Sequence, residues 1–396
     1  MLSNSFRITL RKLYREKLYA LINVAGLSLG IACCTILGLY LQSELTYDQH
    51  FANHKNIFRI ENEFNINGKI DDFALTSPVL GQMLVDEYPE FQEFVRLRPI
   101  VMGNLGEKLI YSYEDRSFSW ETCYFADDNF FEVFKHEIIY GDPETALDEP
   151  NTVAISETFA NKYFDDENPI GKVMRHENGA ANTVTLVYAD LPENTHVKYD
   201  YVESFNLPAL DIPPNTAGRR QRLFNVGVYT YLVMPDNYDV ADFKPVSDKF
   251  FADHMESMAS QDNVIWRSWL QPLADVHLNS NVDGDLPVGN KLYLYGFSLV
   301  AVFILVIACI NYMNLATARY AKRAREVGMR KILGAGRAQL VLQFLGEALC
   351  FSLIALALAI LLVQISFISS PVNSLLDKQL ALDFTNNPEL IGWLAG

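Results

Sequence analysis

The chain alternates between long uncharged runs and polar stretches. Three uncharged runs cover Leu18–Ser43, Leu292–Ala318 and Ala348–Leu376. Each is longer than the ~20 apolar residues with which a helix crosses the hydrocarbon core of a bilayer. The third run contains Pro371, and a proline inside a helical pattern ends or bends the helix. The pattern therefore predicts membrane-spanning helices over residues 18–43, 291–318 and 338–366.

The polar stretch between the first two helices, residues 44–290, has the periodicities of both strands and helices. The alternation in "IFRIENEF" predicts a half-buried strand, and "VGVYTYLVM" and "VIWRSWLQPL" read as further strands. The segment "SPVLGQMLVDEYPEFQEFVRLR" predicts an amphipathic helix, with Ser77 as N-cap and Pro78 as first residue, followed by a strand. A second helix is predicted in "VADFKPVSDKFFADHMESMA".

These elements form two strand–helix–strand units, near residues 55–100 and 226–275. The region between the units is rich in aromatic residues, Gly, Pro and Asn, and its pattern is more β than α. We therefore expect one α+β subdomain, split between about 50–100 and 226–280, with a β-rich subdomain at about 101–225 inserted into it.

The charge distribution predicts the orientation of these segments. The chain has a formal net charge of −16, yet residues 1–17 carry five Lys or Arg against one acid, and Arg319–Arg337 carries seven against one. The long stretch 44–290 has 18 basic and 42 acidic residues, a net of −24. Short basic segments stay on the cytoplasmic side. We therefore expect a cytoplasmic N-terminal amphipathic segment (1–17), a cytoplasmic helix or loop (319–337) and an external domain (44–290).

Residues 367–396 would then form an external loop and the start of a fourth membrane helix. The segment "PELIGWLAG" has an interfacial Trp393 followed by apolar residues. We expect that helix to continue beyond this sequence, as if the chain were truncated.

The motifs of common enzyme classes are missing. "GDLPVGNKL" has the glycine spacing of a phosphate-binding loop, but Asn290 stands where the lysine belongs and no hydroxyl residue follows. The five cysteines show no metal spacing, and no GxSxG or HExxH occurs. His196 is interpreted as a loop histidine with local hydrogen bonds, and Asp275 with His277 as a surface pair on one strand face. We expect no catalytic residue, cofactor, metal or nucleic-acid partner.

Two small-residue features point to packing. Gly26 and Gly30 form a GxxxG pattern in the first membrane helix, which favours close contact with another helix. In the basic loop, Ala321, Ala324 and Gly328 give part of a predicted helix a flat apolar face. From the residues alone, docking on a cytosolic partner and anchoring to anionic membrane lipid explain this loop equally well.

The basic loop resembles that of FtsX-like ABC transporter permeases. The family pattern Arg-x-x-Glu-[Ile/Val]-Gly-x-Arg-x-x-x-Gly-Ala is met at every fixed position, by Arg323, Glu326, Val327, Gly328, Arg330, Gly334 and Ala335. "ITLRKLYREKLYALINVAGLSLGIACC" is similar to the first helix of the MacB-like members, with Asn23, Gly26 and Gly30 in the familiar places. "LTSPVLGQML", "DLPENTHVKYDYV" and "QPLADVHL" resemble their periplasmic core domain.

The resemblance implies an integral membrane α-helical protein with a large α+β periplasmic domain, multi-pass in the bacterial inner membrane. It implies a dimer with a second permease copy or half, a cytosolic ABC ATPase that docks on the seven motif residues, and a periplasmic adaptor protein as a further partner. ATP-driven movement of the loop would then move the periplasmic domain and export a substrate from the periplasmic side. This sequence starts directly at the first helix, so we expect the ATPase on a separate chain and no enzyme activity here.

Two other functions remain open at this point. A lipoprotein-releasing permease of the same family would need a hydrophobic cleft between the external domain and the first two helices. A membrane-anchored ligand sensor would need a cytosolic output domain, for which residues 319–337 are too short.

Overall fold

The structure is a computed structural model, and it describes residues 17–100, 108–205, 222–223, 225–262, 264–286, 288–318, 327–329, 332 and 336–368. The chain divides into two compact units. One unit contains residues 1–45 and 290–396, and the other contains residues 46–289.

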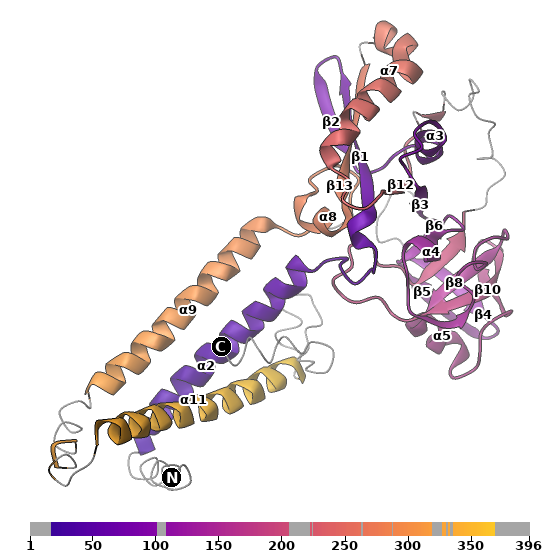
Figure 1. Cartoon of the computed structure of the whole chain (residues 1–396). Helices are drawn as coiled ribbons and strands as arrows, with labels where there is room; N and C mark the ends of the chain where they lie inside the picture. Colours follow the sequence, from indigo (N-terminus) through magenta and orange to yellow (C-terminus); the bar gives the residue numbers. More distant parts are fainter. Residues whose placement is uncertain are drawn as a thin grey trace. The chain divides into compact units, whose positions relative to one another are not determined.

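The first unit contains three long helices (Figure 1), which are α2 (Lys17–Leu45), α9 (Lys291–Ala318) and α11 (Arg337–Ile368). Each contains a candidate membrane span, at Leu21–Leu45, Lys291–Asn311 and Ala348–Phe367 respectively. The prediction of three membrane helices is confirmed for the described part of the chain. The predicted fourth helix lies outside the described residues.

Helix α2 packs against both other helices of this unit. Its contact with α11 is apolar, because Ala32 and Leu39 are buried against Ala359, Val363 and Phe367. Large apolar side chains on α9, such as Leu292, Phe303 and Ile307, stay exposed. An exposed apolar helix surface is the surface that a bilayer solvates.

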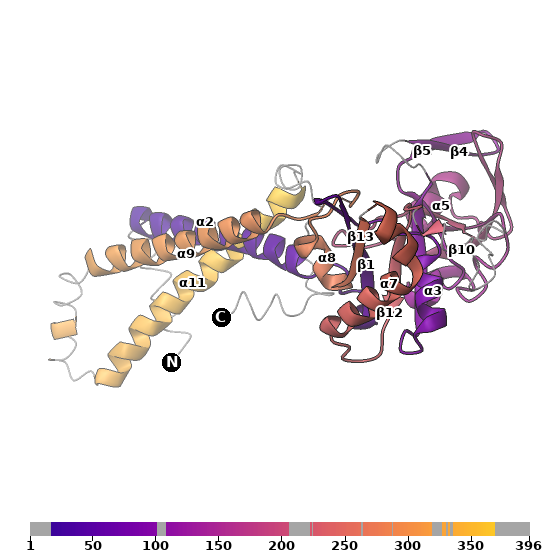
Figure 2. The same ribbon diagram turned by 90° about the horizontal axis from the view of Figure 1, so that it is seen from above.

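The second unit is built on one mixed sheet (Figure 2), which has 13 strands within the described residues. The main path through the sheet runs β13-β1-β12-β3-β6-β11-β8-β10-β9-β4-β5, with β2 paired to β1 and β7 paired to β10. The strands are β1 (Ile57–Ile66), β2 (Lys69–Phe73), β3 (Glu93–Pro99), β4 (Leu109–Tyr113), β5 (Arg116–Trp120), β6 (Cys123–Ala126), β7 (Ile138–Gly141), β8 (Thr152–Ser156), β9 (Val173–His176), β10 (Ala181–Tyr188), β11 (Tyr201–Ser204), β12 (Tyr229–Val233) and β13 (Val264–Pro272).

Short helices and one long helix accompany this sheet. They are η1 (His54–Asn56), α3 (Leu80–Glu87), α4 (Phe130–Val133), α5 (Glu157–Phe164), η3 (Val240–Asp242), α7 (Phe243–Asp262) and α8 (Leu273–Asn279). Helices α3 and α7 bury Leu80 and Phe250 with Phe58 of β1 and Leu270 of β13 in one apolar cluster. Helix α5 buries Phe159 in a separate cluster.

The strand order separates the two predicted subdomains without breaking the sheet. The first four strands of the path, β13, β1, β12 and β3, come from the outer segments of the unit, and the other strands of the path come from residues 109–204. The two groups meet where β3 pairs antiparallel with β6, with Leu97 opposite Ala126. The inserted region is therefore an extension of the same sheet.

Two local predictions are wrong. Helix α3 begins at Leu80 with Val79 as N-cap, because the Ser77 hydroxyl accepts from the backbone N–H of Val79 (3.3 Å) in the turn that precedes the helix. The segment "LADVHL", predicted as a strand, lies in helix α8, so Asp275 and His277 do not share a strand face. Apolar residues three apart, Leu273 and Val276, are buried there, which is the spacing of a helix.

Candidate functional site

The predicted ATPase-coupling residues lie in the segment between α9 and α11. Val327 and Gly328 are in a helical turn over residues 327–329, while Arg323, Glu326, Arg330, Gly334 and Ala335 lie outside the described residues. A Cβ atom added to Gly328 would have no neighbour within 4 Å. Packing inside the described part of the chain therefore gives no reason for glycine at this position.

The two glycines of the GxxxG pattern face helix α9. A Cβ atom added to Gly26 would lie 2.9 Å from the Asn311 side-chain nitrogen, and one added to Gly30 would lie 2.9 Å from Ala308 Cβ. Real Cβ atoms do not approach other heavy atoms this closely, so a larger residue would push the two helices apart.

The second unit, residues 46–289, corresponds to the predicted external domain and is called the external unit below. It binds the chain tightly at Thr46–Asp48, directly after α2. Asp48 adopts a left-handed conformation (φ 58°), which Asp tolerates better than most residues. Its backbone N–H donates to the Asn194 carbonyl (2.9 Å), and the Asn194 side-chain amide donates to the Thr46 carbonyl (2.9 Å) and hydroxyl (3.0 Å). We call this set, with His196 and Tyr231, the first anchor.

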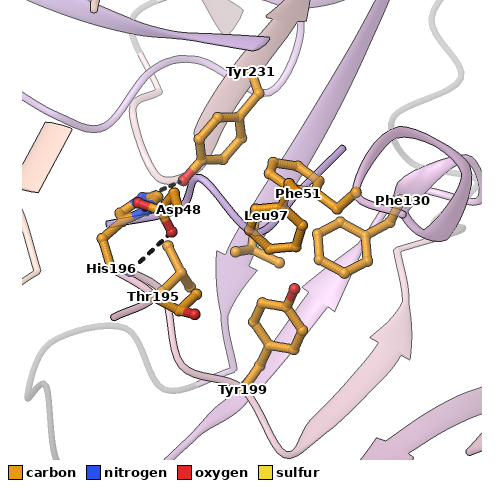
Figure 3. Close-up of a pocket in the computed structure, with 10 residues that line it drawn as sticks. Asp48, Phe51, Leu97, Phe130, Thr195, His196, Tyr199 and Tyr231 are labelled. Carbon is orange, nitrogen blue, oxygen red and sulfur yellow. Dashed lines mark hydrogen bonds and ion pairs between the residues drawn. The ribbon is translucent and has the colours of Figure 1, made fainter. Parts of the chain in front are cut away.

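His196 connects the first anchor to the sheet (Figure 3). Its Nδ1 lies 2.7 Å from Asp48 Oδ2, its backbone N–H donates to Asp48 Oδ1 (3.1 Å), and its Nε2 lies 3.0 Å from the Tyr231 hydroxyl on β12. The side chains of Asp48 and His196 are 0% and 4% exposed. His196 lies in a loop, as predicted, but the prediction that its hydrogen bonds are local is wrong, because its side-chain partners are 148 and 35 residues away.

A small cavity adjoins the first anchor. Asp48, Thr195 and His196 lie on one side of it, and Phe51, Phe130 and Tyr199 lie on the other (Figure 3). The cavity has room for about one water molecule, so it is too small for an organic ligand as it stands. The cavity is therefore part of the packing around the anchor.

A second buried polar cluster holds the segment that leads to α9. Arg59 on β1 donates from Nη1 and Nη2 to the two carboxylate oxygens of Asp285, at 2.7 Å each, and from Nη2 to Glu61 (2.5 Å) and to the Ser280 hydroxyl (2.9 Å). The Arg59 side chain is 0% exposed and that of Asp285 is 6% exposed. We call this set the second anchor.

Electrostatics keep both partners of the second anchor charged. Burial would lower the pKa of Arg59, but the hydrogen bonds and charge of Asp285 outweigh burial and raise that pKa. Burial would raise the pKa of Asp285, but the hydrogen bonds and charge of Arg59 outweigh it and lower that pKa. Glu61 also accepts from Trp269 Nε1 (3.0 Å), which ties the cluster to β13.

A stacked ring pair links the first anchor to helix α8, which lies just before Ser280 of the second anchor in the chain. Tyr47 of the first connection stacks on His277 of α8, with ring centroids 3.3 Å apart and planes 2° apart. The His277 carbonyl accepts from the backbone N–H of Gly289 (2.8 Å), just before α9. Both connections of the external unit to membrane helices are thus bound to the same sheet and to each other.

These two polar clusters hold the fold together, and their residues are not arranged as a reactive site. Within the described ranges, no group of three or more His, Cys, Asp and Glu side chains is placed to hold a metal ion. Asp48, His196 and Tyr231 resemble a proton relay, but Tyr231 is 1% exposed and burial raises its pKa well above its ordinary range. A buried, protonated Tyr beside a cavity that has room for only about one water molecule is a hydrogen-bond donor that fixes geometry.

Sequence reasoning did not select Asp48, Arg59 or Asp285. One signal was available for Arg59, which is charged and stands between Phe58 and Ile60 in a strand where all three residues are buried. Buried charges in proteins are paired, so an arginine inside an apolar strand implies a carboxylate partner. The identity of that partner, 226 residues away, was not accessible to the same reasoning.

Comparisons with known proteins bear on the whole chain. The family model described as the MacB-like periplasmic core domain matches residues 20–245, and the model described as the FtsX-like permease C-terminal region matches residues 298–395. A search among curated protein sequences found no match.

Several solved structures are similar to the chain at low identity. A domain of a protein described as a permease, from Porphyromonas gingivalis, is 18% identical over 61% of this chain and 94% of its own, with a TM-score of 0.47. The periplasmic region of MacB from Actinobacillus actinomycetemcomitans is 14% identical over 52% and 87%, with a TM-score of 0.33. The extracellular domain of the noncanonic ABC-type transporter YknZ from Gram-positive bacteria is 12% identical over 53% and 99%, also at 0.33.

The family assignment rests on the two family models, the first of which alone matches more than half of the chain. The resemblance noted in the sequence is thereby confirmed. The chain belongs to the family of FtsX-like ABC transporter permeases with a MacB-like periplasmic core domain.

Proposed function

We propose that this ABC transporter permease subunit works by mechanotransmission. ATP hydrolysis on a cytosolic ABC ATPase, carried on a separate chain, would move the segment around Gly328. The membrane helices would pass this motion to the external domain, which would drive export of a substrate from the periplasmic side. The proposal includes a dimer with a second permease copy or half, a location in the bacterial inner membrane and a periplasmic adaptor as a further partner.

The pair of anchors is the observation that carries this proposal. A flexible linker between a membrane helix and a domain would absorb motion, whereas a buried, hydrogen-bonded connection passes it on. The first anchor binds Asp48, three residues after α2, and the second binds Asp285, six residues before α9. A displacement of either helix would therefore act on strands β1 and β12 directly.

The loop between α9 and α11 supports docking as the role of the motif residues. Gly328 lies in a helical turn and a Cβ atom there would have no neighbour within 4 Å among the described residues, while the neighbouring Met329 is 65% exposed. A small residue that none of these neighbours requires is suited to close approach by another protein. Lipid anchoring would favour a larger apolar residue there.

The test is co-purification of the permease with an ABC ATPase, identified by its Walker motifs, together with measurement of ATPase stimulation in lipid nanodiscs. Glu326→Lys and Gly328→Trp should each lose the ATPase and its stimulation. Glu16→Lys, which makes the same charge change in the N-terminal segment, and Met329→Trp, which places the same indole side chain one residue further on, serve as controls and should retain both. Equal binding and stimulation in all five proteins would refute docking at this loop.

Hydrogen–deuterium exchange on the reconstituted complex tests the coupling itself. Nucleotide should change amide exchange in β1 and β12 of the wild type. Asp48→Asn, which weakens the first anchor without altering the cytoplasmic loop, should retain ATPase binding but show a smaller change in these strands. If nucleotide leaves exchange of the external domain unchanged in the wild type, the mechanotransmission proposal is contradicted.

A further inference from the structure

Strands β3, β6 and β11 are neighbours in the sheet, and one of its faces carries an unusual row of side chains across them. Arg98 of β3 lies opposite Phe125 of β6, and Phe125 lies opposite Glu203 of β11. Residues directly opposite each other on paired strands point to the same face of a sheet. A base, an aromatic ring and an acid are therefore adjacent on this face.

Arg96, two residues before Arg98 on the same strand face, shows how a structural arginine is satisfied here. It donates to Asp127 from Nε (3.0 and 3.1 Å) and Nη2 (2.7 Å), and from Nη1 to the Pro78 carbonyl (2.7 Å). Each of its three guanidinium nitrogens thus donates to an acceptor.

Arg98 has no such partner. Among the described residues it makes no ion pair, and its Nε is buried without an acceptor. Its guanidinium carbon lies 4.8 Å from the ring centroid of Phe125 and 5.3 Å from that of Phe205. These rings stabilise the cation, but an aromatic face cannot satisfy the in-plane N–H donors that suit an oxyanion.

Glu203 is not a direct partner of Arg98, because Phe125 stands between them and the two form no ion pair within the part of the chain that the structure describes. Burial lowers the pKa of Arg98, and the charge of Glu203 opposes this only in part. Burial raises the pKa of Glu203 to about 7, against the opposing effects of Asn182 and Arg98. The carboxyl group is therefore partly protonated near neutral pH. Among the described residues Arg98 is therefore a cation without an ion-pair partner, although residues 44–290 contain 42 acidic and 18 basic residues.

We propose that Arg98, Phe125 and Phe205 form a binding site for a carboxylate carried on a hydrophobic body. The guanidinium edge would bind the two carboxylate oxygens, as a planar fork of donors does. Phe125, which is partly exposed, would contact the apolar part of the ligand, while the buried Phe205 packs beside it, with the two ring centroids 6.1 Å apart. The surrounding domain carries a net charge of −24 and repels anions. Any preference of this site for an anion would therefore come from Arg98.

The test measures binding of 1-naphthoate to the full-length protein in lipid nanodiscs at pH 8, without ATP or ATPase, with empty nanodiscs subtracted. 1-Naphthalenemethanol has the same ring system without the charge. The wild type should bind the carboxylate at least about tenfold more tightly than the alcohol, the range expected for one charge-assisted contact. Arg98→Gln should abolish this preference. Arg175→Gln, which removes an exposed charge on β9, should keep it.

A second variant, expected to bind the carboxylate more tightly, keeps the test informative if Arg98→Gln fails to fold. Glu203→Gln leaves Arg98 in place and removes the carboxyl group of the row, whose pKa of about 7 makes it largely ionised at pH 8, so 1-naphthoate should bind more tightly than to the wild type. The proposal is overturned if the wild type shows no saturable binding, if it binds both probes equally, or if Arg98→Gln keeps the preference. None of these outcomes bears on coupling to an ATPase, because no nucleotide is present.

Discussion

Removal of one carboxylate, by Asp285→Asn, should destabilise the external domain strongly. Arg59 is 0% exposed and donates to both carboxylate oxygens of Asp285 at 2.7 Å. The variant leaves Arg59 with Glu61 and without its main partner. Breaking a buried ion pair lowers the free energy of unfolding by about 3–5 kcal/mol when the remaining charge is left unpaired. Because Glu61 still pairs with Arg59 in the variant, we expect a loss at the lower end of that range, about 3 kcal/mol.

Denaturation of the full-length protein, followed by tryptophan fluorescence, measures this loss. Trp269 reports on the cluster directly, since its indole N–H donates to Glu61. Asp165→Asn is the matched control: it breaks the Arg116–Asp165 pair of 2.6 Å, whose side chains are 39% and 70% exposed. Water screens this exposed pair, so its removal should shift the denaturation midpoint far less. Equal shifts in the two variants would refute the reasoning that burial makes the second anchor strong.

The lowered pKa of Asp285 also predicts how the loss of stability in Asp285→Asn depends on pH. Its pKa is lowered in the folded protein, so the stabilisation is present above the ordinary Asp pKa of ~3.9 and is lost as pH falls through the folded value. Asp285→Asn should therefore differ most from the wild type near neutral pH. The difference should narrow in strong acid.

Two further predictions concern other parts of the molecule. Burial lowers the pKa of His136 to about 3, so the wild type should lose stability as pH falls from about 6.5 towards 3, because only the unfolded chain binds the proton. His136→Phe should flatten that pH dependence of the melting temperature. In the membrane unit, Gly30→Leu should lower the melting temperature in nanodiscs, since its Cβ would lie 2.9 Å from Ala308, whereas Gly38→Leu, with nothing within 4 Å, should not. If Gly38→Leu lowers the melting temperature as much as Gly30→Leu does, close packing of α2 on α9 is contradicted.

The candidate site was only partly accessible from the sequence. Composition and motif spacing selected the basic loop, and five of its seven motif residues lie outside the described residues, so their role stays a prediction. The anchors were missed because each is assembled from distant segments. Asp48 meets His196 and Arg59 meets Asp285 only after the chain has folded across the sheet.

The sequence by itself determined the features that depend on local composition. Long uncharged runs specify membrane helices because a bilayer core accepts nothing else of that length. Alternation and helical spacing specified β1, β13 and α7 within the external stretch. The family motifs were likewise readable in the chain alone.

The tertiary structure alone decided which side chains meet. "LADVHL" forms a helix and not a strand, since its buried residues follow helical spacing in the contacts that the fold provides. His196 gained partners from the α2 connection and from β12, and Arg98 was left without one while Arg96 was satisfied two residues away. These outcomes depend on contacts between residues far apart in the chain, which local periodicity does not encode.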